Sequence, residues 1–303
     1  MVNLILPQKV DSMRENFGRL SNLWKTNAAI NQSALDYDEL NFDPALDDFN
    51  ESLLPFHQLQ AWQEAPTTVR SCCLSYAWAI YNLKTIYIEC DIVTPVCEDL
   101  IKIPPAGSCN QTLLQELMAE TLLDEALHTK MSVSATNYIY QMRGLPQLRF
   151  QDFNLINWRN RILAQCNAEW ERRLTRFAIA CASETLITDY LKTMTEDSGI
   201  QPICHLVTQT HAMDEWRHSS VFSSIAMDII HSLSTKERTY LQHIIEQTVS
   251  MFTDKEMGAW RQVFTMVDLP GSDTLLANSD NLSEIKIYQD SVNSLLQHIG
   301  LKN

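Results

Sequence analysis

Two five-residue segments of this sequence combine carboxylates with an imidazole at a spacing that suits metal binding. The segments are DEALH at residues 124–128 and DEWRH at residues 214–218. In each, a glutamate and a histidine are three residues apart, so on a helix they share one face, about one turn from each other. The two pairs are Glu125 with His128 and Glu215 with His218. One such pair arises easily by chance, but two, each preceded by an aspartate, favour a shared metal site.

A helical bundle that binds two metal ions in this way takes one further glutamate from each of the other two helices. The pattern therefore predicts a lone acid in the helix before each motif. Glu89 and Glu184 meet this requirement, since each stands alone in a long, largely apolar stretch that holds no other acid. A carboxylate in such a setting is costly unless it is paired or bound to metal.

A third histidine shares the face of the second motif. His211 lies four residues before Glu215 and seven before His218, so it is a seventh candidate ligand; the alternative is a histidine with no metal role. Carboxylates can bridge two irons, and imidazoles can fill terminal positions while leaving room for dioxygen, although manganese would also suit this set. The remaining histidines have no such partners and are interpreted as structural.

The aspartate that opens each motif lies one residue off the ligand face. Asp124 and Asp214 could each accept a hydrogen bond from a ligand histidine across the bundle, which would fix the tautomer of that histidine. The alternative is a solvated surface acid. Arg217 could pair with either aspartate.

The elements that would position these residues are long helices, and the low content of seven glycines agrees with this. The turn and cap signals predict helices over about 9–31, 66–103, 110–142, 157–196, 202–231, 234–266 and 281–299. Pro95 should kink or end the second of these near Thr94. The expected fold is all-α: a ferritin-like bundle with a four-helix di-iron core and extra N- and C-terminal helices. We expect one domain over 1–303, with its core at about 66–266 and flanks at 1–65 and 267–303.

Composition narrows the class of protein further. Hydrophobic residues make up 45% and charged residues 20% of the 303 positions, which is typical of a globular chain. A net charge of −14 argues against nucleic acid and against an anionic membrane surface as partners. No apolar run reaches the length of a membrane span. The eight cysteines form no C-x-x-C pair, which predicts a reducing, cytoplasmic location.

With these residues in this register, the sequence resembles the p-aminobenzoate N-oxygenase (AurF-type) family of non-haem di-iron enzymes. The resemblance covers about residues 60–260, including the segment WAIYNLKTI at 78–86 just before Glu89. It implies a ligand set of Glu89, Glu125, His128, Glu184, His211, Glu215 and His218. It also implies two iron ions, dioxygen as co-substrate, an external electron donor and oxidation of an amine through a peroxo-diferric intermediate. The product would be a hydroxylamine, with nitroso or nitro compounds after further rounds, in secondary-metabolite biosynthesis.

Residues that contact the substrate are harder to predict. Tyr81 and Lys84 precede Glu89 on the same helix, and Tyr190 follows Glu184. Lys84 could hold a substrate carboxylate or be a solvated lysine, and the tyrosines could line the cavity or simply pack in the core. The amine could be an aryl amine, an amino acid or a carrier-linked amine. The expected partners are therefore a small-molecule amine, a reductase or other electron donor, and a carrier protein if the amine is carrier-linked. A homodimer is expected from family analogy and the general frequency of twofold assembly.

Two other functions remain open at this stage. Another di-iron oxidase, such as a hydroxylase, desaturase or radical-generating subunit, usually has six ligands, so His211 argues against it. A non-enzymatic iron-binding bundle would usually be shorter than this chain.

Overall fold

The computed structural model describes residues 41–105, 111–278 and 287–302, with side chains from residue 290 onward in the last stretch. Within these ranges the regular elements are helices, and one isolated parallel bridge joins Asp47 to Ile200. The predicted all-α class is thus confirmed. None of the described helices is both long and apolar enough to cross a membrane. Residues 42–303 form one compact unit, and the helix predicted at 9–31 lies outside the described residues.

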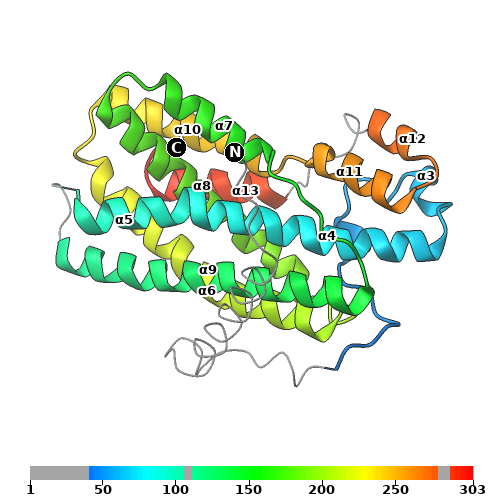
Figure 1. Cartoon of the computed structure of the whole chain (residues 1–303). Coiled ribbons are helices and arrows are strands. Elements are labelled where there is room, and N and C mark those ends of the chain that lie inside the picture. Colours follow the sequence, from blue (N-terminus) through cyan, green and yellow to red (C-terminus); the bar gives the residue numbers. More distant parts are fainter. Residues whose placement is uncertain (1–40, 106–110, 279–286, 303) are drawn as a thin grey trace, which may run out of the picture. The chain divides into compact units, whose positions relative to one another are not determined.

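Four long helical segments form the core of this unit (Figure 1). The first is α4 (Thr67–Ile88), which continues through the short π-helix η3 (Glu89–Val93) into α5 (Thr94–Lys102). The others are α6 (Gln111–Arg143), α8 (Glu169–Thr195) and α9 (Pro202–Ile230). α6 packs against α4 and α5, α9 packs against α8, and α6 also contacts α9. α8 in turn contacts η3 and α5, which closes a four-helix bundle with the predicted motifs on two adjacent members, α6 and α9.

Pro95 does not end the first of these helices. Proline has no N–H to donate to the carbonyl four residues earlier. The helix accommodates the missing N–H with a π turn just before Pro95. In this turn the Thr94 N–H donates to the Glu89 carbonyl, five residues earlier. Single π turns of this kind are frequent at functional sites in helices. Here the turn begins at Glu89, a predicted ligand.

Two predicted helices are each divided into two in the structure. The segment predicted at 157–196 forms α7 (Asn154–Gln165) and α8, because the chain breaks at 166–168. The Glu171 side chain accepts the N–H groups of Asn167 and Ala168 there and starts the new helix. The prediction of one helix was therefore wrong, and the helical stretch begins at Asn154, before the predicted start at 157.

The segment predicted at 234–266 forms α10 (Thr235–Phe252) and α11 (Met257–Val267). The predicted capping box at its start is present, with Ser234 and Glu237 exchanging hydrogen bonds. The break at 253–256 contains neither glycine nor proline. Instead, Asp254 accepts the Glu256 N–H at 2.8 Å, and Glu256 takes a left-handed conformation with φ of 49°. Such local bonds from Asp side chains compete with the helix.

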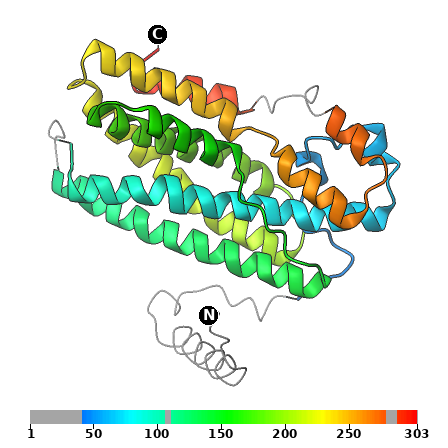
Figure 2. The same cartoon turned by 45° about the horizontal axis from the view of Figure 1, so that its top comes forward.

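Further helices cover two parts of the bundle, as Figure 2 shows. α7, α10 and α13 (Ile287–His298) pack against α8. α3 (Gln60–Gln63), α11 and α12 (Ser272–Ala277) form a second group beside α4. The second group encloses an aromatic cluster of Phe56, Trp62, Trp260 and Phe264. The 3-10 helix η2 (Glu51–Leu53) leads into this group.

Candidate metal centre

The structure brings all seven predicted ligands together inside the bundle. Glu89 begins η3, Glu125 and His128 lie on α6, Glu184 lies on α8, and His211, Glu215 and His218 lie on α9. None of the seven is more than 3% exposed. Ionisable side chains are rarely buried to this extent unless they are paired or bound to metal.

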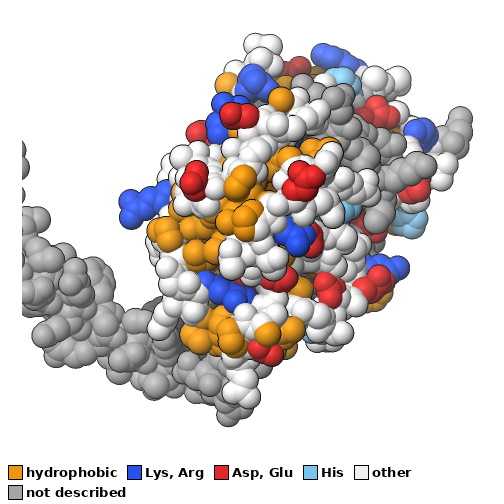
Figure 3. Space-filling model, turned by 90° about the vertical axis from the view of Figure 1, so that its right-hand side faces the viewer, with side chains coloured by type: hydrophobic (Ala, Val, Ile, Leu, Met, Phe, Trp, Pro, Cys, Tyr) orange, Lys and Arg blue, Asp and Glu red, His pale blue; other side chains and the backbone are white. Residues whose placement is uncertain are grey.

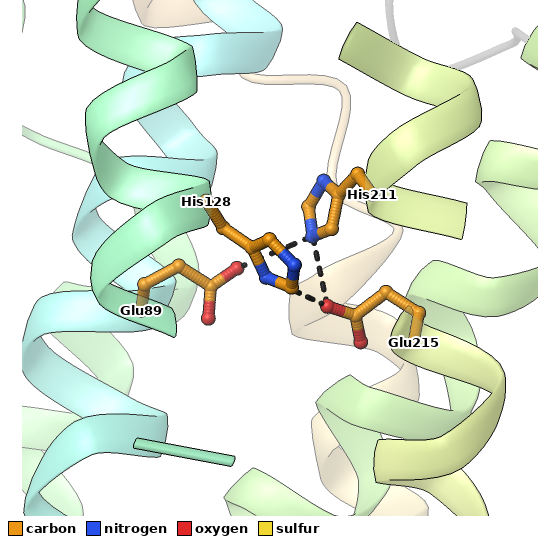
Figure 4. Close-up of side chains that lie close together, drawn as sticks. All are labelled: Glu89, His128, His211 and Glu215. Atoms are coloured by element: carbon orange, nitrogen blue, oxygen red, sulfur yellow. Dashed lines mark hydrogen bonds and ion pairs between the residues drawn. The ribbon is translucent and has the colours of Figure 1, made fainter. Parts of the chain in front are cut away.

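The ligand atoms fall into overlapping groups, and within each group all the atoms lie within 4.8 Å of one another. One group contains Glu89, His128, His211 and Glu215, as Figure 4 shows. A second contains Glu125, His128, Glu215 and His218, and a third contains Glu89, Glu125 and Glu184. Because His128 and Glu215 belong to both four-residue groups, the groups mark two neighbouring positions for an ion, with shared residues between them.

Each histidine turns one nitrogen toward the carboxylates. Nε2 of His211 lies 2.8 Å from Oε1 of Glu215. Nδ1 of His128 lies 3.0 Å from Oε2 of Glu125, and Nδ1 of His218 lies 3.1 Å from Oε1 of Glu125. The inner nitrogens are therefore the ones available to an ion.

The other nitrogen of each histidine has a partner outside the cluster. Nε2 of His128 lies 3.2 Å from Asp214, and Nε2 of His218 lies 3.2 Å from Asp124. An ionised carboxylate can only accept a hydrogen bond, so Nε2 of each histidine carries a proton. Nδ1 is then the nitrogen that can bind a metal. Nδ1 of His211 lies 3.3 Å from the Tyr81 hydroxyl. Arg217 pairs with Asp214, not with Asp124.

The carboxylates of the cluster lack enough protein partners. One oxygen of each glutamate is buried without a hydrogen bond: Glu89 Oε2, Glu125 Oε1, Glu184 Oε2 and Glu215 Oε2. Two of these oxygens, on Glu125 and Glu184, lie 3.1 Å and 3.4 Å from the single Nδ1 of His218, which cannot satisfy both. Buried polar atoms are almost always satisfied in native proteins. Carboxylate oxygens without a hydrogen bond that face imidazole nitrogens fit the ligand set of a metal pair.

Electrostatics divide the four glutamates into two kinds. Burial, reinforced by the neighbouring carboxylates, raises the pKa of Glu89 and of Glu184 well above the usual range. Burial would also raise the pKa of Glu125 and of Glu215. Hydrogen bonds with His128 and His218 instead lower the pKa of Glu125, and its three histidine neighbours hold the pKa of Glu215 well below the usual range. Without a cation, the cluster therefore retains protons on Glu89 and Glu184. A metal would replace these protons.

A cavity of about 220 Å³ adjoins the cluster. Its lining includes Tyr81, which contacts His211, together with Ile88, next to Glu89, and Ile187, one turn after Glu184. Tyr190 also lines it and stacks on Tyr81 with ring centroids 5.8 Å apart. Three residues were predicted to contact substrate, and all of them line this cavity: Tyr81, Lys84 and Tyr190.

Lys84 lines this cavity but is not a solvated lysine, since its side chain is only 15% exposed. Nζ lies 2.9 Å from Oε1 of Glu256 and donates to the Phe252 carbonyl at 2.9 Å. Glu256 was not predicted as a site residue. It stands in a polar stretch far from Lys84 in the sequence, and no local pattern joins the two.

The fold and the cluster define a class of protein: a helical bundle with a carboxylate- and histidine-rich centre for two metal ions. The chain matches the family described as P-aminobenzoate N-oxygenase AurF over residues 11–300, and it belongs to this family of oxygenases. It is also similar to the 4-aminobenzoate N-oxygenase of Streptomyces thioluteus, with 24% identity over 264 residues, which cover 86% of this chain and 78% of that protein. The predicted family and the prediction of an enzyme are both confirmed.

Proposed function

We propose that this protein holds two iron ions between its seven buried ligands and uses dioxygen to oxidise the nitrogen of a small aromatic amine. The observation that carries the proposal is the buried set of four glutamates and three histidines beside an aromatic cavity. The third histidine, His211, distinguishes this set from the usual six-ligand centre of di-iron bundles. Membership of an N-oxygenase family supports the reaction type.

The two ion positions would draw on different residues. Glu89 and His211 would serve one position and Glu125 and His218 the other, and His128 and Glu215 belong to both groups. Glu184 lies with Glu89 and Glu125 in the third group, with Oε2 3.4 Å from Nδ1 of His218. When bound, the iron pair supplies the redox chemistry that activates dioxygen. For the first step, RNH₂, O₂, two electrons and two protons give RNHOH and water. The two electrons come from an external donor, such as a reductase, and further rounds would give nitroso and nitro products.

The chain's own residues would orient the reactants and keep water away. Asp124 and Asp214 fix the imidazoles of His218 and His128. The Tyr81 and Tyr190 rings offer an aromatic wall on which an aryl amine can stack. Ile88 and Ile187 add apolar side chains to the cavity lining, which would help to exclude water. The amine lone pair must point toward the cluster for attack.

The direct test is turnover by the metal-loaded enzyme. The protein is loaded with Fe(II) without oxygen and analysed for metal, and about two irons per chain are expected. It is then exposed to air with a chemical reductant and a panel of aryl amines. Mass spectrometry should detect hydroxylamine, nitroso or nitro products. Protein loaded identically but carrying Glu184→Ala is the control.

Two results would count against the proposed function. Fully loaded protein that consumes no oxygen and forms no N-oxygenated product from any amine would overturn it. Metal analysis that finds manganese instead of iron in active enzyme would overturn the choice of metal alone.

A further inference from the structure

The cavity beside the cluster is lined by balanced charges. Its charged lining residues are two lysines, Lys84 and Lys255, and two acids, Asp254 and Glu256. Figure 3 views the molecule from the side of α3, α11 and α12, where apolar side chains gather with acidic and basic ones between them. Lys84 and Glu256 are the more deeply buried pair, with side-chain exposures of 15% and 4%.

The positive charge of Lys84 is matched within the protein. Nζ lies 2.9 Å from Oε1 of Glu256, donates to the Phe252 carbonyl at 2.9 Å, and lies 5.7 Å from the centre of the Phe252 ring. A substrate carboxylate that approached Nζ would therefore also approach the Glu256 carboxylate. Like charges brought together at an interface disfavour binding.

The fold holds Glu256 in this place at a cost. Its backbone is left-handed, with φ of 49°, a conformation that few residues other than glycine adopt. Two contacts keep it there: the Asn154 N–H donates to Glu256 Oε2 at 3.2 Å, and Asp254 accepts the Glu256 N–H at 2.8 Å. Strained residues that the surroundings hold in place cluster at functional sites.

We infer that Glu256 determines substrate specificity: by matching the charge of Lys84, it makes the cavity select an amine without a free carboxylate. The substrate class is a neutral aryl amine, or one whose carboxyl group is masked as an amide, ester or thioester. The inference rests on the proposed function for the reaction itself. This substrate class differs from 4-aminobenzoate, the compound in the name of the Streptomyces thioluteus relative, because 4-aminobenzoate carries a free carboxylate.

Binding tests the inference without turnover. Calorimetry compares 4-aminobenzamide with 4-aminobenzoate on the iron-loaded protein without oxygen. The two compounds have nearly the same shape and differ in charge. We expect the amide to bind at least about 10-fold more tightly, since close charges change affinity by this much or more. Equal or tighter binding of 4-aminobenzoate would overturn the inference.

Variants assign the preference to Glu256. Glu256→Gln keeps an oxygen for the Asn154 N–H but leaves the Lys84 charge unmatched, so the preference should shift toward 4-aminobenzoate by about 10-fold or more. Glu246→Gln, at an exposed position on α10, makes the same change in net charge and should leave the preference as it is. Adding Lys84→Met to Glu256→Gln should abolish the gain for 4-aminobenzoate.

The outcomes separate the two proposals. A folded Glu256→Gln protein, with a melting temperature near that of the wild type, whose preference equals the wild-type preference would overturn the inference. If Glu256→Gln does not fold, the wild-type comparison and the Lys84→Met/Glu256→Gln protein decide the question. Absence of product from either compound, with the binding preference intact, would overturn the proposed function and leave the specificity assignment standing.

Discussion

Asp214 on α9 accepts a hydrogen bond from Nε2 of His128 on α6 at 3.2 Å, and the reverse contact exists between Asp124 on α6 and His218 on α9, also at 3.2 Å. Each motif thus supplies a glutamate and a histidine to the cluster and an aspartate to the histidine of the other motif. Burial would raise the pKa of Asp214, but the hydrogen bond and charge of His128 lower it below the usual value. The ionised aspartate then keeps the proton on Nε2 and Nδ1 turned inward.

These aspartates should therefore strengthen metal binding without touching the metal. Asp124→Asn and Asp214→Asn are each expected to weaken Fe(II) affinity by about 10–100-fold, as loss of such supporting contacts typically does. Competition with a coloured chelator under anaerobic conditions measures this. Glu120→Gln, at an exposed position on α6, is the matched control. Wild-type affinity in both aspartate variants would show that they are ordinary surface acids.

The local part of the site could be predicted from the sequence. Helical periodicity alone places Glu125 with His128, and His211 with Glu215 and His218, on single faces. Glu89 and Glu184 could be found because a lone acid in an apolar helix demands a partner. The all-α fold follows from the same periodicity and from the few turn residues.

The rest depends on contacts between distant segments. No sequence pattern joins Lys84 to Glu256, which meet only after α11 packs beside α4. The helix break before Glu256 has no glycine or proline; instead, Asp254 accepts hydrogen bonds from the Glu256 N–H and the Asn154 side chain there. The helix does not end at Pro95, because a π turn can accommodate a missing N–H within a continuing helix.

The third histidine gives the sharpest test of the ligand set. His211→Ala should lower bound iron from about two to about one per chain, because His211 and Glu89 share one ion position and His211 is in no other group. Anaerobic iron analysis and oxygen consumption measure this. His243→Ala, at an exposed position on α10, should leave both unchanged. Wild-type iron content and oxygen reactivity in His211→Ala would reduce the set to six ligands.

A second buried ion pair holds the chain before α3 against the bundle. The Asp48 side chain is fully buried and accepts from Arg143 Nε at 3.0 Å and from the Ser75 hydroxyl. Arg143→Met would leave this carboxylate without its charge partner, so we expect a loss of about 3–5 kcal/mol in the free energy of unfolding.

Urea denaturation of the metal-free protein measures this loss. Arg149→Met, at an exposed position, is the control and should change stability by less than about 0.5 kcal/mol. Adding Asp48→Asn to Arg143→Met should recover part of the loss, because no unpaired charge then remains buried. A loss in Arg143→Met no greater than that in the control would mean that the pair does not stabilise the fold.

Metal binding should release protons and should strengthen as the pH rises. Burial and the neighbouring carboxylates raise the pKa of Glu89 and Glu184 well above the usual range, so both carry protons in the metal-free protein. Below these raised pKa values protons compete with the metal, and affinity falls as the pH falls.

Anaerobic calorimetry in two buffers with different protonation enthalpies gives the number of protons released. Burial would lower the pKa of His128, but its hydrogen bonds to Asp214, Glu125 and Glu215 raise it well above the usual value, so it adds to the release. Glu184→Gln should lower the count by about one, while Glu116→Gln, at an exposed position on α6, should not. Equal apparent enthalpies in both buffers, with affinity constant between about pH 6 and pH 8, would contradict the assignment of these protons to the cluster.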